Sequence, residues 1–151
     1  MRNFINQKRE FIAGLLAVLL TLGIYFVYLF PRIFFWKDTS IWAFSNGVCG
    51  DWGAHLTYAS VFAYKPISAW LMHPVYYGNT FNYPFGADMI SGLLIRAGLD
   101  YVSAFILPSI FTAIFFLIML YIFYYHFFKN PKQAYLAIII FHKKGPWFLC
   151  Q

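Results

Sequence analysis

Asp51 and His55 are the residues of this chain whose types and spacing best suit chemistry. They lie four positions apart in the hexapeptide Gly50-Asp51-Trp52-Gly53-Ala54-His55, and residues at that spacing project from one face of an α-helix. A carboxylate can act as a general base toward an acceptor hydroxyl or bind a metal ion. An imidazole can orient that carboxylate, hold a phosphate as a cation or bind metal. The spacing therefore predicts a polar pair at the start of a short helix.

Structural roles are open for both residues. Aspartate is a favoured helix N-cap, so Asp51 could serve only to begin its helix. Capping needs one side-chain oxygen, and the two roles can therefore coexist. His55 could be a polar tip in the lipid headgroup region of a membrane. Two ligands are too few to define a metal site.

Five further residues with side chains that can do chemistry are candidates of lower rank. Asp88 begins a second expected helix, where it would act as a cap or contact substrate. His73 precedes a proline, so its backbone is extended and it can shape a turn. Arg96 and Lys65 could pair with a lipid phosphate or simply extend into the headgroup region. Cys49 is interpreted as a small buried apolar residue rather than a reactive thiol.

The elements that must position these residues belong to a membrane protein. Hydrophobic residues make up 62% of the chain and charged residues 11%, whereas globular domains carry about 25% charged residues. Residues 11–30 form an apolar run relieved only by Thr21, which as a helix covers about 30 Å, the thickness of the bilayer core. The run lacks the small-x-small site of a cleaved signal peptide, so we expect a retained span. Residues 102–128 form the second expected span.

The candidate residues lie in the long loop between the spans, residues 31–101. Its many aromatic side chains suit the headgroup region. We expect two short amphipathic helices in it, over residues 51–64 and 88–97, the second followed by Gly98 as a C-terminal stop. The expected fold is therefore an all-α membrane protein with a long loop that carries short helices.

A third apolar run, residues 134–141, is followed by His142-Lys143-Lys144. Eight helical residues reach about 12 Å, which is too short to cross a bilayer. We therefore predict an incomplete third span, a natural protein that continues beyond Phe141, and an aberrant or truncated tail over residues 142–151.

The net charge of +6 is concentrated next to the expected spans. The basic residues that flank them are Arg2, Lys8, Arg9, Lys129, Lys132, Lys143 and Lys144. Because basic residues accumulate on the cytoplasmic side, we expect a multi-pass protein of the cell membrane with a cytoplasmic N-terminus and an extracytoplasmic loop 31–101. The charge forms no single aromatic-interleaved patch, so the lipid bilayer and not nucleic acid is the expected partner.

The sequence also lacks the phosphate-binding glycine loop, the dinucleotide fingerprint, HExxH and paired CxxC motifs. No charged residue lies inside either complete expected span. Buried ionisable groups usually mark ion or proton pathways, so a channel or pump is disfavoured.

Four stretches resemble the N-terminal part of bacterial multi-pass glycosyltransferases of the type-C superfamily, which is related to protein mannosyltransferases and lipid A aminoarabinose transferases. They are residues 50–59, His73-Pro74, residues 83–88 and residues 93–99. The resemblance covers roughly residues 11–141. It implies an enzyme that takes a sugar from a polyprenyl-phosphate donor and inverts the anomeric carbon.

In that superfamily, an acidic residue in the first extracytoplasmic loop acts as base on the acceptor, and Asp51 is the position that matches it. His55, Asp88 and Arg96 are the substrate-binding candidates. Some members bind a divalent metal, so the cofactor is undefined here. Members have roughly three to four times as many spans, which implies that this chain lacks most of the donor cavity and is inactive alone.

Two alternatives to a glycosyltransferase fragment stay open. The chain could be a non-enzymatic membrane protein, such as an accessory subunit or scaffold, in which Asp51 and His55 tolerate replacement by alanine. It could also be a fragment of a transporter or lipid flippase, which predicts ionisable residues or broken helices in later spans. The sequence indicates neither the sugar, nor the acceptor, nor the oligomeric state.

Overall fold

A computed structural model of the chain describes residues 2–43, 51–76, 78–80, 82 and 85–144. The described residues are mostly helical. The chain divides into two compact units, residues 31–109 and residues 1–30 with 110–151, and each is described by itself. Two helices in the described part of the chain, Asn6–Ile33 and Tyr101–Phe128, are long and apolar enough to cross a membrane.

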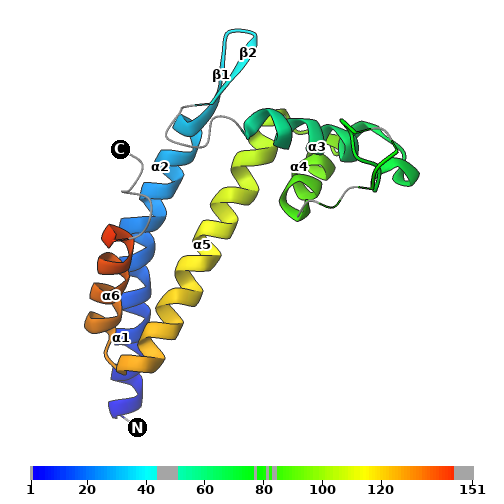
Figure 1. Ribbon diagram of the computed structural model, residues 1–151. Coiled ribbons are helices and arrows are strands. Elements are labelled where there is room, and N and C mark those ends of the chain that lie inside the picture. The colour runs from blue at the N-terminus through cyan, green and yellow to red at the C-terminus, as the bar shows by residue number, and fades with distance from the viewer. Residues whose placement is uncertain (1, 44–50, 77, 81, 83–84, 145–151) are drawn as a thin grey trace. The chain divides into compact units, whose positions relative to one another are not determined.

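The first of these helices consists of three consecutive segments: α1 (Arg2–Val18), the π-helical turn η1 (Leu19–Gly23) and α2 (Ile24–Ile33) (Figure 1). It extends beyond the expected span at both ends. The Thr21 hydroxyl donates to the Ala17 carbonyl at 2.8 Å, so this polar group is satisfied within its own helix. In the most apolar window only 17% of the residues are buried. A core helix of a soluble protein would be mostly buried, so this exposure favours lipid around the helix.

The second apolar helix is α5 (Tyr101–Phe128), which agrees with the expected span to within one residue. A short turn then leads to α6 (Pro131–Lys144). Helix α6 is longer than the apolar run 134–141, because Asn130 caps its start: Asn130 Oδ1 accepts from the Lys132 amide at 2.9 Å. Its 14 residues reach about 21 Å, still less than the bilayer core.

Helices α1 and α6 pack side by side, as Figure 1 shows. The start of α6 lies beside Gly14, where Pro131 is the neighbour. Its other end lies beside Tyr25, whose ring centroid is 5.6 Å from that of His142. The backbone of Lys143 and Lys144 is thus at the opposite end of α6 from Lys132. The charge pattern alone groups these lysines on one side of the membrane, whereas the structure separates them along α6.

The core of this unit is apolar with one buried hydroxyl. Its buried members are Val18, Leu22, Leu117, Tyr121, Ala134 and Ile138. The Tyr121 hydroxyl donates to the Phe11 carbonyl at 3.0 Å. It also occupies the space that a side chain at Gly14 would need. A glycine at this position therefore leaves room for the Tyr121 hydroxyl and for Pro131 at the start of α6.

The unit of residues 31–109 contains the two expected short helices, α3 (Trp52–Tyr64) and α4 (Gly86–Arg96). Helix α3 agrees with the prediction over 51–64, and a short 3-10 turn, η2 (Ile67–Ala69), follows Pro66. Helix α4 begins two residues earlier than expected. The predicted stop is confirmed: Gly98 has a φ of +104°, a conformation that glycine adopts without strain.

The buried side of α4 contains one glycine, two polar residues and one isoleucine, and its glycine contacts α3 most closely. Its buried members are Asp88, Ser91, Gly92 and Ile95. A Cβ at Gly92 would lie 2.5 Å from the Ala59 carbonyl oxygen and 2.6 Å from Phe62 Cβ. Ile90 and Leu93 lie on the exposed side of α4 and do not make this contact.

A β-hairpin in the same unit corrects the expectation of an all-α fold. Strands β1 (Phe34–Lys37) and β2 (Ser40–Ala43) pair antiparallel around the two-residue loop Asp38-Thr39. Asp38 has a φ of +54°, which aspartate tolerates better than most residues. The Phe34 ring stacks on Trp52 at 4.4 Å between centroids, so the hairpin packs against the start of α3.

Candidate functional site

The buried carboxylate of Asp88 contacts the imidazole of His55 where α3 and α4 pack together. His55 Nδ1 lies 2.9 Å from Asp88 Oδ1 and 3.1 Å from Oδ2. The side chain of Asp88 is 3% exposed and that of His55 is 31% exposed. The small residues of the α3–α4 contact permit this pairing, because they bring the two helices close together. The pair therefore has a buried acidic member and a more accessible basic member.

Burial raises the pKa of Asp88, and the hydrogen bond and charge of His55 oppose that increase. Desolvation penalises the ionised carboxylate, which makes a hydrogen-bond donor beside it necessary. When Asp88 is ionised, His55 supplies that donor through Nδ1–H, since a carboxylate only accepts hydrogen bonds. In the neutral imidazole this bond places the remaining lone pair on Nε2. The arrangement can therefore orient an imidazole for proton transfer or for binding an anion.

The i, i+4 spacing suggests that His55 orients Asp51, whereas the structure pairs His55 Nδ1 with Asp88. The expectation that Asp88 caps the second helix is wrong for a related reason. Asp88 lies in the first turn of α4, Phe85 occupies the N-cap position, and Phe85 makes no side-chain cap bond. The carboxylate faces α3 and makes a tertiary contact instead.

Asp51 occupies the N-cap position of α3, as predicted, but its side chain makes no capping hydrogen bond. The helix begins through its backbone, where the His55 amide donates to the Asp51 carbonyl at 3.0 Å. The Asp51 side chain is exposed, one helical turn before His55. Capping by the carboxylate therefore does not account for this residue.

Arg96 and Lys65 lie at the C-terminal ends of the two short helices. The Arg96 guanidinium donates to the Phe62 carbonyl at 3.4 Å and lies 6.0 Å from the ring centre of Trp70. A cation at the last turn of α3 is electrostatically favourable. Lys65 is the exposed C-cap residue of α3. Arg96 thus has a structural role, and a role in binding phosphate stays a prediction.

His73 shapes a turn, which confirms that expectation. Its Nδ1 accepts from the amides of Val75 at 3.2 Å and Tyr76 at 3.1 Å. Tyr83 and Pro84, which belong to the stretch 83–88 that carries the family resemblance, lie outside the described part of the chain, as do Cys49, Gly50 and Cys150.

Asp100 is a residue that sequence reasoning did not select. Its Oδ1 accepts from Trp36 Nε1 at 2.9 Å and from the amides of Val102 and Ser103 at 3.0 and 3.1 Å. Hydrogen bonds from Ser103, Trp36 and the backbone lower its pKa to about 2. The sequence signal was present, since an aspartate directly precedes a long apolar helix. Asp100 fastens the hairpin to the start of α5.

Over the described residues, no group of three or more His, Cys, Asp or Glu side chains could hold a metal ion. Asp88 and His55 are two such residues, one short of the smallest set. The residues described here therefore do not fit the divalent metal of some type-C enzymes.

Comparisons of the chain with protein-family models, with curated proteins and with solved structures find no match. The class that fold and site define is accordingly broad: a mostly helical protein with two helices that could cross a membrane and a buried carboxylate–imidazole pair.

Proposed function

We propose that this chain carries the base-bearing part of an integral membrane glycosyltransferase of the type-C kind. Asp51 would be the general base, and the donor would be a sugar linked to polyprenyl phosphate. The chain would lie in the cell membrane with residues 31–101 on the extracytoplasmic side. The observation that supports this most is the His55–Asp88 pair, one helical turn from an exposed carboxylate that does not cap its helix.

The proposed reaction needs two groups close together. Asp51 takes the proton of the acceptor hydroxyl while that oxygen bonds to the anomeric carbon. The bond from this carbon to the phosphate oxygen breaks, and polyprenyl phosphate leaves with the electron pair. His55, held by Asp88, contacts the departing phosphate as a hydrogen-bond donor or cation. Arg96 is a second candidate for this phosphate contact.

The pair also supports function on energetic grounds. A buried carboxylate is costly unless it is paired, and apolar side chains would pack α4 on α3 without that cost. The presence of an acid and an imidazole at a helix interface favours a role beyond packing. The candidates closest to this role are Asp51, His55 and Asp88.

Because the chain is expected to be inactive alone, the test is sugar transfer in cells that express the full chain and are supplied with labelled polyprenyl-phosphate sugars. Replacing Asp51 by asparagine should lower transfer by a factor of about 10²–10⁴ and leave donor binding unchanged. Asp38→Asn is the matched control, because Asp38 is also exposed and asparagine tolerates its backbone conformation. A chain that neither binds nor consumes any such donor would contradict the proposal.

A non-enzymatic accessory role has one observation in its favour. Arg96 contacts the end of α3 and Asp100 joins the hairpin to α5, so two of the polar side chains in this unit fasten its elements together. An accessory subunit predicts that Asp51→Ala and His55→Ala leave cellular sugar transfer unchanged.

A further inference from the structure

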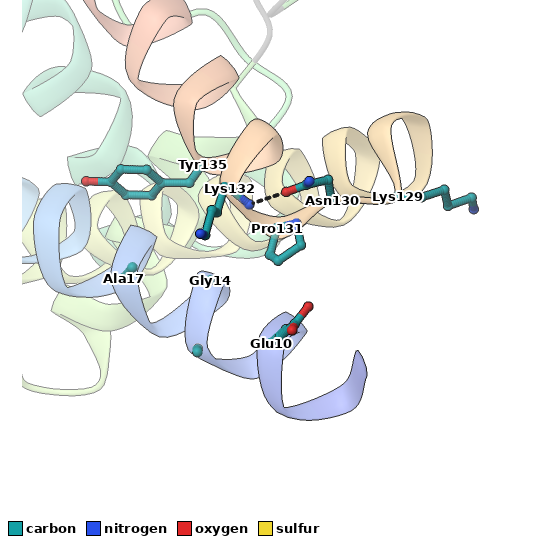
Figure 2. A pocket seen from close by; sticks show the side chains of 9 residues that line it. Glu10, Gly14, Ala17, Lys129, Asn130, Pro131, Lys132 and Tyr135 are labelled. Carbon is teal, nitrogen blue, oxygen red and sulfur yellow. Dashed lines mark hydrogen bonds between the residues drawn. The ribbon is translucent and has the colours of Figure 1, made fainter. Parts of the chain in front are cut away.

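A groove lies between the start of α1 and the turn that joins α5 to α6, within the unit of residues 1–30 and 110–151 (Figure 2). Its volume is about 590 Å³, in the range of small-ligand pockets. Its floor on α1 is made of small residues, Ala13, Gly14 and Ala17, and its opposite wall includes Pro131 and Tyr135. The groove is open because these α1 residues have almost no side chain to fill it.

The turn that carries the two lysines of the groove, Lys129 and Lys132, has a defined backbone. Lys129 has a φ of +53°, and its amide donates to the Tyr125 carbonyl at 2.8 Å, which ends α5. Asn130 Oδ1 then caps α6 through the Lys132 amide, a bond drawn in Figure 2. These hydrogen bonds fix the backbone positions of Lys129 and Lys132, and both residues therefore line the groove.

Figure 2 shows Lys132 extending toward α1, whereas Lys129 extends away along the rim, where its Nζ lies 3.3 Å from His126 Nδ1. Glu10 is the acidic member of the lining, and its carboxylate also points toward the gap. Two cations and one anion leave a net positive charge. Lys8 lines a neighbouring groove of about 420 Å³ with Gln7, Phe11, Ile12 and Tyr125, which adds a cation on another side of α1.

We propose that this groove binds the headgroup of an anionic phospholipid. Lys132 would contact the phosphate, Lys129 would add positive charge at the rim, and an acyl chain would follow the apolar side of α1 at Ala13 and Ala17. The combination of basic residues and an apolar floor at the end of two membrane-length helices matches such a headgroup. Glu10 repels the phosphate and limits the affinity. The proposal is independent of the glycosyltransferase hypothesis.

The test uses the full chain in neutral detergent micelles with phosphatidylglycerol or phosphatidylcholine added, and native mass spectrometry counts bound lipid. Phosphatidylglycerol should be retained in preference to phosphatidylcholine. Lys132→Gln should weaken its retention about fivefold, the effect expected of one lysine near an anionic headgroup. Glu10→Gln should strengthen retention by a similar factor. Lys143→Gln/Lys144→Gln, which removes two lysines from the other end of α6, should leave it unchanged.

A second variant tests the groove without altering charge. Ala13 is exposed, so Ala13→Trp fills the groove without entering the core and should abolish the preference for phosphatidylglycerol. Equal weakening by the Lys132 and Lys143/Lys144 variants would overturn the proposal, because binding would then depend only on total charge. Loss of lipid in the presence of equimolar inorganic phosphate would overturn it as well, since the site would then bind the free anion.

Discussion

Both units of the molecule have a glycine at a contact between helices, but the polar group beside each glycine differs. Gly92 faces the backbone carbonyl of Ala59, and the pair on the same helices is ionisable, His55 with Asp88. Gly14 faces the hydroxyl of Tyr121, a neutral group that donates to the Phe11 carbonyl. A neutral hydrogen bond is sufficient for packing, particularly for a helix expected to lie in lipid. An ionisable pair costs more to bury, which is why we propose a role beyond packing for His55 and Asp88.

Substitution of Gly92 should cost more stability than substitution of Gly14, because the neighbour of Gly92 is a rigid backbone group and that of Gly14 is a side chain. Gly92→Ala places a methyl group against a backbone carbonyl that cannot rotate away, and it should lower the free energy of unfolding by about 1–3 kcal/mol. Chemical unfolding of the full chain in micelles, with hydrogen exchange in α3 and α4, measures this.

Gly53→Ala is the control for that variant, because an added Cβ at Gly53 meets nothing within 4 Å. It should be neutral or stabilise α3 by up to about 1 kcal/mol. Equal destabilisation by both variants would show that the α3–α4 contact is not as close as described.

Gly14→Ala should have a smaller effect, since the Tyr121 side chain can move. The variant should lose the hydrogen bond to Phe11 and cost about 1 kcal/mol. The same unfolding measurement applied to Gly14→Ala/Tyr121→Phe should give less than the sum of the single changes, because removing the hydroxyl makes space. If the free-energy costs of the two single changes simply added in the double variant, the contact between Gly14 and the Tyr121 hydroxyl would be contradicted.

The ionisable pair should give the unit of residues 31–109 a pH dependence. The pKa of Asp88 is raised above 3.8 in the folded chain. The stability that it contributes is therefore full below pH 3.8 and is lost as the pH rises through the raised pKa. Asp88→Asn should flatten this part of the stability curve, measured by unfolding across pH. Asp38→Asn should leave it intact, and a curve unchanged by Asp88→Asn would contradict the assignment.

Asp100 should act with the opposite sign and the smallest effect, since it is exposed. Its pKa falls from 3.8 to about 2 on folding, so its contribution is present above pH 3.8 and is lost as the pH falls toward 2. The Asp100→Asn variant should therefore lack the fall in stability that this carboxylate causes between pH 3.8 and about 2. Hydrogen exchange at the start of α5 between pH 2 and 4 would detect it, and a change seen only above pH 4 would be inconsistent.

Local sequence signals predicted most helices and little of the site's geometry. The apolar runs, Lys65-Pro66 and Gly98 placed helix boundaries well, because those signals act within a few residues. The hairpin was missed although Phe35 to Trp42 is rich in aromatic residues around a two-residue turn. The hairpin was not predicted because its apolar residues have the same composition as the neighbouring membrane-like segments.

The pairing of His55 with Asp88 could not be read from spacing, because the two residues are 33 positions apart. It depends on the close contact of Gly92 with Ala59, and that contact is a property of the folded helix pair. The i, i+4 rule selected Asp51 as the partner of His55, since such a rule considers only one helix. Sequence therefore identified the three side chains and did not identify which two are bonded.

The sidedness of residues 31–109 tests the central proposal most directly, because a base for a polyprenyl-phosphate donor must lie outside the cytoplasm. The measurement is labelling of intact cells with a membrane-impermeant maleimide after Cys49 and Cys150 are replaced by serine. Thr39→Cys places a thiol in the exposed hairpin loop, and Gln133→Cys places one on the exposed start of α6. The proposal predicts that Thr39→Cys is labelled in intact cells and Gln133→Cys only after permeabilisation. The reverse pattern would contradict it.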